Sequence, residues 1–187
     1  MKKIIFSTFL LSITLFAYTN YKCEYKDNNI EVNWKAFKTP IKVGVNGAFN
    51  KIEFTSKIKK ANDIKDLLLN SNVKIYTYSV NSNNKDRDGK LVNSFFKILN
   101  NKKIYAKITD VKDKILIIEL NMNGIVKKVP MNYNYKDGKV VAKGVIDLFD
   151  FKASKALQSI NKACYDLHKG KTWNDIVIGF KLNINCK

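Results

Sequence analysis

The chain has few of the side chains that enzymes use for polar chemistry. Its 187 residues contain one histidine, His168, and no Gly-rich phosphate-binding loop. A single histidine cannot build a His-based metal site, and Cys23, Cys164 and Cys186 lie far apart, without the spacing of metal ligands. The position of His168 at the end of a predicted helix favours a cation that complements the helix dipole. We therefore expect no catalytic residue, no metal site and no cofactor, and we expect that the protein is not an enzyme.

Arginine is almost absent as well. Arg87 is the single arginine, and its neighbours Asp86 and Asp88 favour a local ion pair that orders a loop. Every other cation is lysine, and the formal net charge of +18 falls to +16 when Lys2 and Lys3 are removed. Bidentate readers of phosphates and bases are usually arginines, so nucleic-acid binding is not expected. The lysines predict a solvated cationic surface, with at most weak attraction to anionic membrane surfaces.

Long hydrophobic runs are missing after residue 17. Before that point, Lys2 and Lys3 precede an apolar run over residues 4–16, and Ala17 offers a small residue at its end. This pattern is typical of a secretory signal, and the run is too short to span a bilayer comfortably. We expect a signal peptide over residues 1–17, a single mature domain over residues 18–187, and a periplasmic or secreted location. The alternative is a retained membrane anchor.

Alternating apolar and polar residues dominate the rest of the chain. Only two prolines occur, so long strand-like segments are uninterrupted, and an Asp-Gly pair at residues 137–138 marks a hairpin turn. A change of phase near residues 50–51 indicates a bulge. Helical spacing appears over residues 62–69, with Asn62 as the N-cap, and over residues 154–168. About eight strands are predicted, over residues 30–36, 43–54, 73–80, 104–108, 116–122, 125–135, 140–148 and 176–184.

Residues 73–98 carry the most informative pattern in the chain. A strand-like run opens into the polar loop around Arg87, and an apolar cluster beginning at Leu91 ends in a double Phe. This order resembles the signature segment of the YceI-like family, bacterial periplasmic lipocalin-like proteins that bind polyisoprenoid lipids. The matching residues are Asn81, Asn84, Arg87, Asp88, Leu91, Phe95 and Phe96.

Two further segments extend the resemblance. Residues 120–130 resemble the family's strand-turn-strand element, with an Asn-Gly turn, and residues 144–151 resemble a later strand that ends in an Asp-Phe pair. The similarity runs over about residues 30–184. The chain differs in the helix predicted near residues 155–170, which the shorter family members lack, and at residues 34–37, where His-rich or Thr-rich positions are often found.

Consecutive strands with tight turns favour an up-and-down barrel, although periodicity alone leaves a sandwich open. The resemblance implies the barrel: a mainly β, closed, eight-stranded antiparallel lipocalin-like fold with one or two short helices. In such a barrel the first and last strands pair, which would bring Cys23 and Cys186 together as a disulfide. Cys164 would remain as a buried, inert thiol on the late helix.

The resemblance also implies a function. We expect a polyisoprenoid or similar long-chain amphiphile in an apolar lumen, with the protein acting as carrier or reservoir; the resemblance also leaves a homodimer open. Leu67, Leu68, Phe95 and Phe96 are expected to close one mouth. The expected lining residues are Trp34, Phe49, Ile118, Leu120, Met122, Met131, Tyr133, Ile146 and Phe180.

The alternative is a barrel with a packed core, because eight strands enclose just enough space either for side chains or for one small ligand. Such a protein would be a non-catalytic exported interaction module. It would dock on a partner protein or an anionic surface through scattered lysines and the surface residues Tyr76, Tyr78 and Tyr105.

Overall fold

The computed structural model describes residues 21–99 and 102–187 of the chain. The predicted signal peptide, residues 1–17, lies outside this part. No helix among the described residues is long and apolar enough to cross a membrane. The elements are β1 (Cys23–Lys38), β2 (Val43–Phe49), β3 (Ile52–Thr55), β4 (Lys60–Ala61), α1 (Ile64–Leu68), β5 (Asn72–Tyr76), η1 (Thr77–Ser79), β6 (Val80–Asn81), α2 (Lys85–Leu91), η2 (Val92–Phe96), β7 (Lys103–Val111), β8 (Ile115–Met122), β9 (Ile125–Lys136), β10 (Lys139–Asp147), η3 (Leu148–Phe151), α3 (Ser154–Ala163), α4 (Tyr165–His168) and β11 (Asp175–Cys186).

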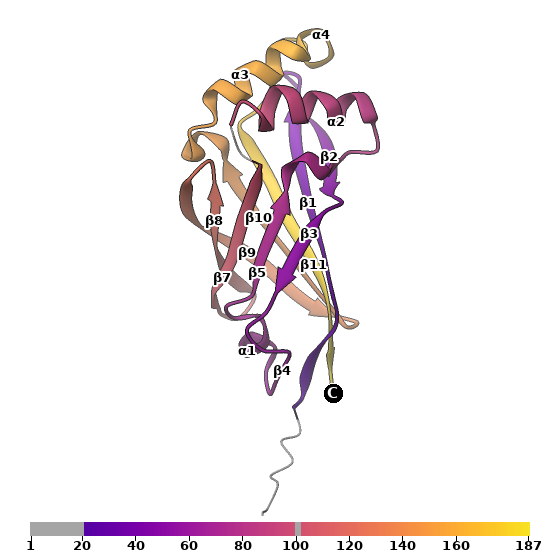
Figure 1. Ribbon diagram of the computed structural model, residues 1–187, viewed down its shortest axis with the longest axis vertical. Helices are drawn as coiled ribbons and strands as arrows, with labels where there is room; N and C mark the ends of the chain where they lie inside the picture. The colour runs from indigo at the N-terminus through magenta and orange to yellow at the C-terminus, as the bar shows by residue number, and fades with distance from the viewer. Residues whose placement is uncertain (1–20, 100–101) are drawn as a thin grey trace, which may run out of the picture.

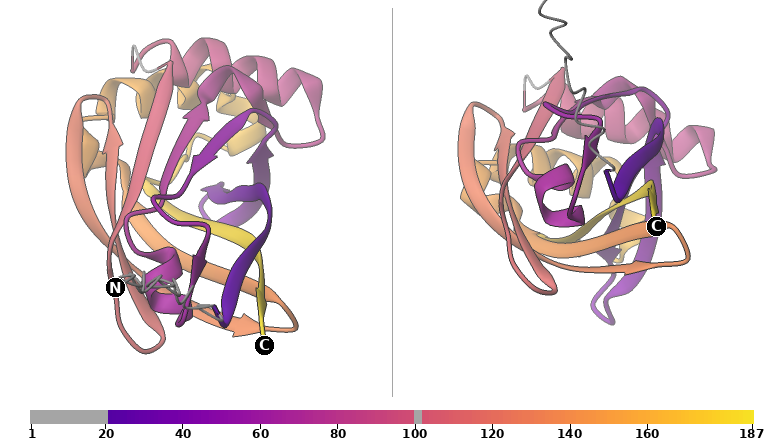
Figure 2. Two further views of the ribbon diagram at one scale, coloured as in Figure 1. Left: turned by 60° about the horizontal axis from the view of Figure 1, so that its bottom comes forward. Right: turned by 90° about the horizontal axis from the view of Figure 1, so that it is seen from below.

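The strands form one antiparallel sheet that curls around an apolar interior (Figures 1 and 2). Neighbouring strands along the sheet follow the order β3-β5-β7-β8-β9-β10-β11-β1-β2-β6, and β4 pairs with β1. The alternation in the sequence has its physical origin here, since every second side chain of a strand faces the interior. The prediction of a mainly β, antiparallel, lipocalin-like fold is confirmed.

The predicted number of strands is wrong: the described residues contain eleven rather than eight. Two long segments are each interrupted. The predicted bulge at Asn50 and Lys51 separates β2 from β3, and the 3₁₀ turn η1 separates β5 from β6. β2 pairs with β6, and β3 pairs with β5. β3 and β6 are the two ends of the strand order, and they are linked covalently because β3 follows β2 in the chain and β6 follows β5.

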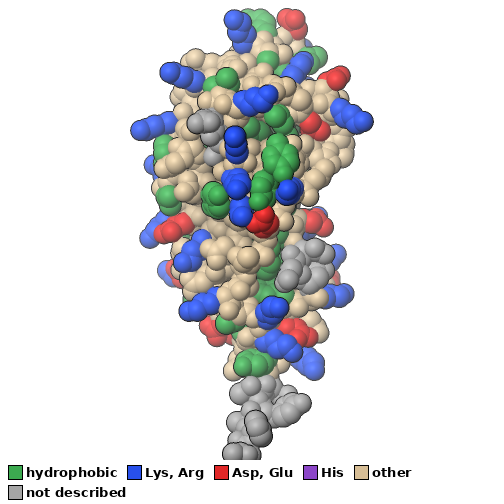
Figure 3. All heavy atoms as spheres, in the orientation of Figure 1, with side chains coloured by type: hydrophobic (Ala, Val, Ile, Leu, Met, Phe, Trp, Pro, Cys, Tyr) green, Lys and Arg blue, Asp and Glu red, His purple; other side chains and the backbone are tan. Residues whose placement is uncertain are grey.

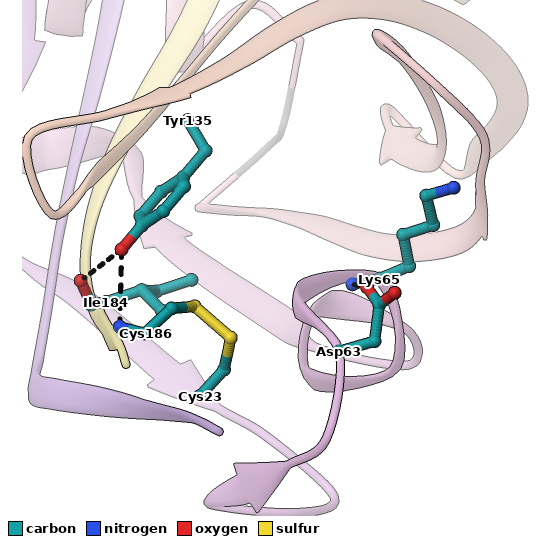
Figure 4. The surroundings of a disulfide bond; sticks show 6 residues. All are labelled: Cys23, Asp63, Lys65, Tyr135, Ile184 and Cys186. Atoms are coloured by element: carbon teal, nitrogen blue, oxygen red, sulfur yellow. Dashed lines mark hydrogen bonds between the residues drawn. A yellow bond between two sulfur atoms is a disulfide. The ribbon is translucent and has the colours of Figure 1, made fainter.

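The disulfide between Cys23 and Cys186 is present and confirms the predicted pairing. The two cysteines lie opposite each other where β1 pairs with β11. Figure 4 shows the neighbouring Tyr135, whose hydroxyl accepts a hydrogen bond from the Cys186 amide at 3.2 Å and donates one to the Ile184 carbonyl at 3.4 Å. The bridge joins the first and last strands across 163 residues of sequence.

The helices cover the two ends of the curled sheet. Figure 1 shows α2 and α3 across one end, and α1 with β4 at the other, close to the C-terminus. At α1 the N-cap is Asp63, whose carboxylate accepts the Lys65 amide at 2.7 Å, rather than the predicted Asn62. The predicted late helix is present but is divided at Cys164 into α3 and α4.

One helix was not expected from the sequence. The segment predicted as a polar loop forms α2, capped by the Asn84 side chain, which accepts the Arg87 amide at 2.8 Å. It continues into the π-helical turn η2, where the Lys97 amide donates to the Val92 carbonyl at 3.0 Å. This turn inserts Phe95 and Phe96 into the interior, where both are buried.

Candidate functional site

An apolar cavity of about 220 Å³ lies inside the curled sheet. Its walls come from the inward faces of the strands, and its helical end is lined by Leu91 of α2, Phe95 and Phe96 of η2, and Leu157 and Ile160 of α3. Among the described residues that line it, none is Asp or Glu. Apolar cavities of about 150 Å³ already bind small hydrocarbons, so a flexible apolar chain could occupy this one.

Ten of the thirteen residues predicted to bind a ligand line this cavity. They come from β1, β2, β8, β9, β10, β11 and η2, which shows that the period-2 alternation had the correct phase on these strands. The ten are Trp34, Phe49, Phe95, Phe96, Ile118, Leu120, Met122, Met131, Ile146 and Phe180.

The remaining three, Leu67, Leu68 and Tyr133, do not line it. Leu67 and Leu68 belong to α1 and are fully buried at the end of the sheet opposite Phe95 and Phe96, so the four residues do not close one mouth. The view from below in Figure 2 shows α1 within the outline of the sheet. Tyr133 is only half-buried. The prediction failed because apolar spacing on a short helix does not say which end of a barrel the helix covers.

The end at α1 is tightly packed. The Tyr25 hydroxyl donates to the Leu67 carbonyl at 2.6 Å and lies 2.9 Å from the Ser71 hydroxyl. Burial raises the pKa of Tyr25, which keeps the phenol neutral. The polar groups of this end therefore satisfy one another.

The indole of Trp34 supplies a polar atom in the cavity wall. Its ring packs directly against Gly47 of β2, where any Cβ atom would collide with it. Its Nε1–H is buried and has no hydrogen-bond partner among the described residues. A buried donor without a partner costs about 1–3 kcal/mol, so this position destabilises the fold by about that amount.

Cations surround the helical end of the cavity. Three cationic side chains contribute to its lining, Lys38 at the end of β1 and Arg87 and Lys90 of α2, and His168 of α4 and Thr172 lie beside them. This rim, which we call the mouth, therefore combines positive charge with hydrogen-bonding groups. The body of the cavity lies below it and is mainly apolar, with Asn33, Ser71 and Lys107 as the further polar residues of its lining.

A hydrogen-bond network holds His168 in place. The Thr172 hydroxyl donates to the Asn161 side-chain oxygen at 2.8 Å, so it must accept from Nδ1 of His168, which lies 2.6 Å away. Burial, followed by the charges of Lys38 and Lys90, lowers the pKa of His168. The lowered pKa favours the neutral imidazole, so His168 lies in the last turn of α4 as predicted but is poorly suited to act there as a cation.

Arg87 does not form the predicted ion pair with its acidic neighbours. Its guanidinium donates to the Ser82 hydroxyl at 2.7 Å and to the Ser82 carbonyl at 2.8 Å. The Asp88 carboxylate accepts from the amide and hydroxyl of the same serine, at 2.8 and 2.6 Å. Arg87 and Asp88 thus anchor the start of α2 to β6, which fixes one side of the mouth.

The other groups at the site offer little chemistry. Cys164 is the free cysteine of the chain, is buried as predicted, and lines the cavity. In residues 21–99 and 102–187, no three His, Cys, Asp or Glu side chains gather in a way that could hold a metal ion. What this arrangement can do is hold an apolar chain and contact a polar group at one end of it.

Sequence reasoning missed the residues of the mouth, although a signal for one of them was present. Trp34, Ala36 and Lys38 are each two residues apart on β1, so Lys38 continues the inward face after the apolar residues end. Lys90 gave no such signal, because its helix was not predicted.

The fold is similar to two solved structures. A polyisoprenoid binding domain from Saccharophagus degradans, implicated in plant cell wall breakdown, has a TM-score of 0.62 at 10% identity, with 90% of this chain and 100% of that chain covered. BcnA of Burkholderia cenocepacia has a TM-score of 0.59 at 15% identity, with 84% of this chain and 99% of that chain covered. At these identities the likeness shows a shared fold. No curated protein sequence matches the chain.

The sequence itself matches a family model. The model describes the YceI-like domain and covers residues 21–184, nearly the whole of the described structure. The chain therefore belongs to the YceI-like domain family, as the pattern in residues 73–98 indicated.

Proposed function

We propose that this protein is an exported, non-catalytic lipid-binding protein that holds a polyisoprenoid or similar long-chain amphiphile in its lumen, as a carrier or reservoir. The observation that carries the proposal is the apolar cavity of about 220 Å³, which has polar and cationic residues at its helical end. Burial of each CH₂ group contributes about 0.8 kcal/mol, so an alkyl or isoprenyl tail needs no specific polar contact to bind.

Two further observations support the proposal. The Saccharophagus degradans domain with the same fold is described as polyisoprenoid binding. The disulfide between Cys23 and Cys186 is typical of proteins in oxidising compartments, which agrees with export to the periplasm or beyond.

The alternative of an interaction module with a packed core is less well supported. A filled core would leave no cavity, and two of the three surface rings proposed for docking, Tyr76 and Tyr78, are already engaged by a neighbouring cation. Lys51 lies 4.7 Å from the ring centre of Tyr76 and 5.8 Å from that of Tyr78. On the face shown in Figure 3, lysines are spread among acidic and uncharged side chains rather than gathered in one patch.

Titration of farnesol into lipid-free protein tests the proposal, with isothermal titration calorimetry as the readout. Wild-type protein should bind about one equivalent. Leu120→Arg places a charge on the buried inner face of β8 and should abolish binding. Val126→Arg is the matched control, because Val126 is exposed on β9 and should tolerate the same charge without loss of binding.

Circular dichroism shows whether both variants keep the fold. Absence of farnesol binding by folded wild-type protein would contradict the proposal. So would a Leu120→Arg variant that folds and binds as well as the control.

A further inference from the structure

The lysines of the chain differ in how their charges are balanced. Most are exposed, and five described ones are half-buried: Lys38, Lys65, Lys74, Lys90 and Lys103. A cation that loses part of its hydration usually gains a compensating partner, because partial burial without one is costly. The five residues can therefore be compared directly for the presence of such a partner.

Three of the five have partners. The Lys65 ammonium lies 2.5 Å from the Asp113 carboxylate, and Lys74 forms an ion pair with Glu53. Lys103 lies 5.2 Å from the ring centre of Tyr76. These side chains follow the general rule for partly buried charges.

Lys38 and Lys90 do not follow it. Within the described residues, neither ammonium group has an ion pair, a side-chain hydrogen bond or an aromatic ring contact. Both line the mouth of the cavity, from β1 and α2 respectively, and the charges of both act on His168. The two unpaired, half-buried lysines therefore both lie near His168, at the helical end of the lumen.

No acidic side chain is available to neutralise them there, because the described lining contains neither Asp nor Glu. An anion would supply what the mouth lacks. The Thr172 hydroxyl is already engaged with Asn161 and His168, so Lys38 and Lys90 supply the N–H donors for such an anion.

Resting on the function proposed above, we propose that the lumen selects amphiphiles with an anionic headgroup, a phosphate or a carboxylate. The headgroup binds against Lys38 and Lys90 at the mouth, and the apolar tail fills the cavity. A neutral alcohol with the same tail gains the burial of the tail but leaves both ammonium groups unpaired. Charge-assisted hydrogen bonds are about twice as strong as neutral ones, so the difference in affinity should be measurable.

The test compares farnesyl monophosphate with farnesol, which have the same tail, by calorimetric titration into lipid-free wild-type protein. The phosphate should bind at least about tenfold more tightly, a difference of about 1.4 kcal/mol. Hexadecanoate and hexadecanol form a second pair that separates a carboxylate from a phosphate preference. Inorganic phosphate alone should bind weakly or not at all, because it has no tail to bury.

The decisive variant is Lys38→Met with Lys90→Met. It should reduce affinity for farnesyl monophosphate to that of farnesol, and leave farnesol binding within about twofold. The matched control, Lys139→Met with Lys143→Met, removes the same charge from exposed positions of β10 and should keep the full preference for the phosphate. If the double variant does not fold, the single Lys90→Met variant and the wild-type preference still decide the matter.

The outcomes separate the two proposals. Equal binding of the phosphate and the alcohol by wild-type protein overturns the anionic headgroup and leaves the lipid lumen intact. Equal loss of both ligands in the double variant overturns it too, because the lysines would then act on the tail or the fold. Failure of wild-type protein to bind any of the four amphiphiles overturns the headgroup and the lipid-binding function together.

Discussion

The two ends of the curled sheet are closed in different ways. At one end α1 packs Leu67 and Leu68 into full burial, Tyr25 and Ser71 satisfy each other, and a disulfide joins β1 to β11. At the other end α2, η2 and α3 surround a mouth where Lys38 and Lys90 lack partners. The polar groups at the α1 end are paired within the protein, whereas the ammonium groups at the other end lack partners that a ligand could supply.

This contrast suggests a division between stability and binding within one small fold. Regions with few unsatisfied groups and dense packing open rarely, whereas binding regions belong to the less stable part of a structure. Substitutions at the α1 end should therefore reduce the free energy of unfolding more than they change ligand affinity. Substitutions at the mouth or in the lumen should do the reverse.

The largest expected effect is loss of the disulfide. In Cys23→Ser with Cys186→Ser, the cross-link over 163 residues is removed, and the chain-entropy model predicts a loss of roughly 5 kcal/mol in the free energy of unfolding. Urea unfolding followed by circular dichroism measures it. A loss of less than about 1 kcal/mol would show that the seam does not depend on the bridge.

Leu68→Ala should have the next largest effect. Leu68 is 0% exposed at the packed end, and such truncations cost about 2–5 kcal/mol. Leu157→Ala is the comparison at the other end, since Leu157 is 9% exposed and already borders the cavity. Leu157→Ala should lower the free energy of unfolding by less than half as much as Leu68→Ala, because the truncation enlarges a cavity that already exists. Equal decreases in the free energy of unfolding of the two variants, measured by urea unfolding, would show that the two ends do not differ in packing.

Filling the lumen should affect binding rather than stability. Ala106 lines the cavity from β7, and Ala106→Leu should weaken both farnesol and farnesyl monophosphate by about tenfold, because both have the same tail. Ala48→Leu, on the outward face of β2, is the control and should leave both affinities unchanged. A selective loss of the phosphate ligand alone would place Ala106 at the headgroup, against the present account.

The smallest expected effect concerns pH. Burial and the charges of Lys38 and Lys90 lower the pKa of His168 from 6.5, so the unfolded chain takes up this proton first as the pH falls. The contribution of His168 to stability is therefore complete above pH 6.5 and declines as the pH falls toward the folded-state pKa. An NMR titration of the single imidazole should show a pKa below 6.5 that rises in Lys38→Met with Lys90→Met. An unchanged pKa in that variant would show that the two lysines do not act on the ring.

Much of the fold could be predicted, because strand alternation is a local property of the sequence. It placed Ile118, Leu120 and Met122 on the inward face of β8, and the first-to-last strand pairing of the barrel brought Cys23 next to Cys186. The predicted number of strands was too low because the backbone turns at residues 50–51 and in η1, where the sequence keeps its strand-like composition.

The mouth was harder to predict, because it is assembled from segments far apart in the sequence. The helix α2 has Gly89 and four charged residues before it, which are typical of a loop, and its stability depends on the Asn84 cap and on the contacts with Ser82. The absence of a partner for Lys90 is a property of the folded molecule alone. No local pattern could report it.

Mass spectrometry of organic extracts from protein purified without detergent, with Leu120→Arg as the comparison, is the most direct test of lipid binding in the lumen. The wild-type extract should contain a near-stoichiometric long-chain species with an acidic headgroup, and the variant extract should lack it. A wild-type extract with no bound lipid, from folded protein that also fails to take up farnesyl monophosphate, would rule out the lipid-binding lumen.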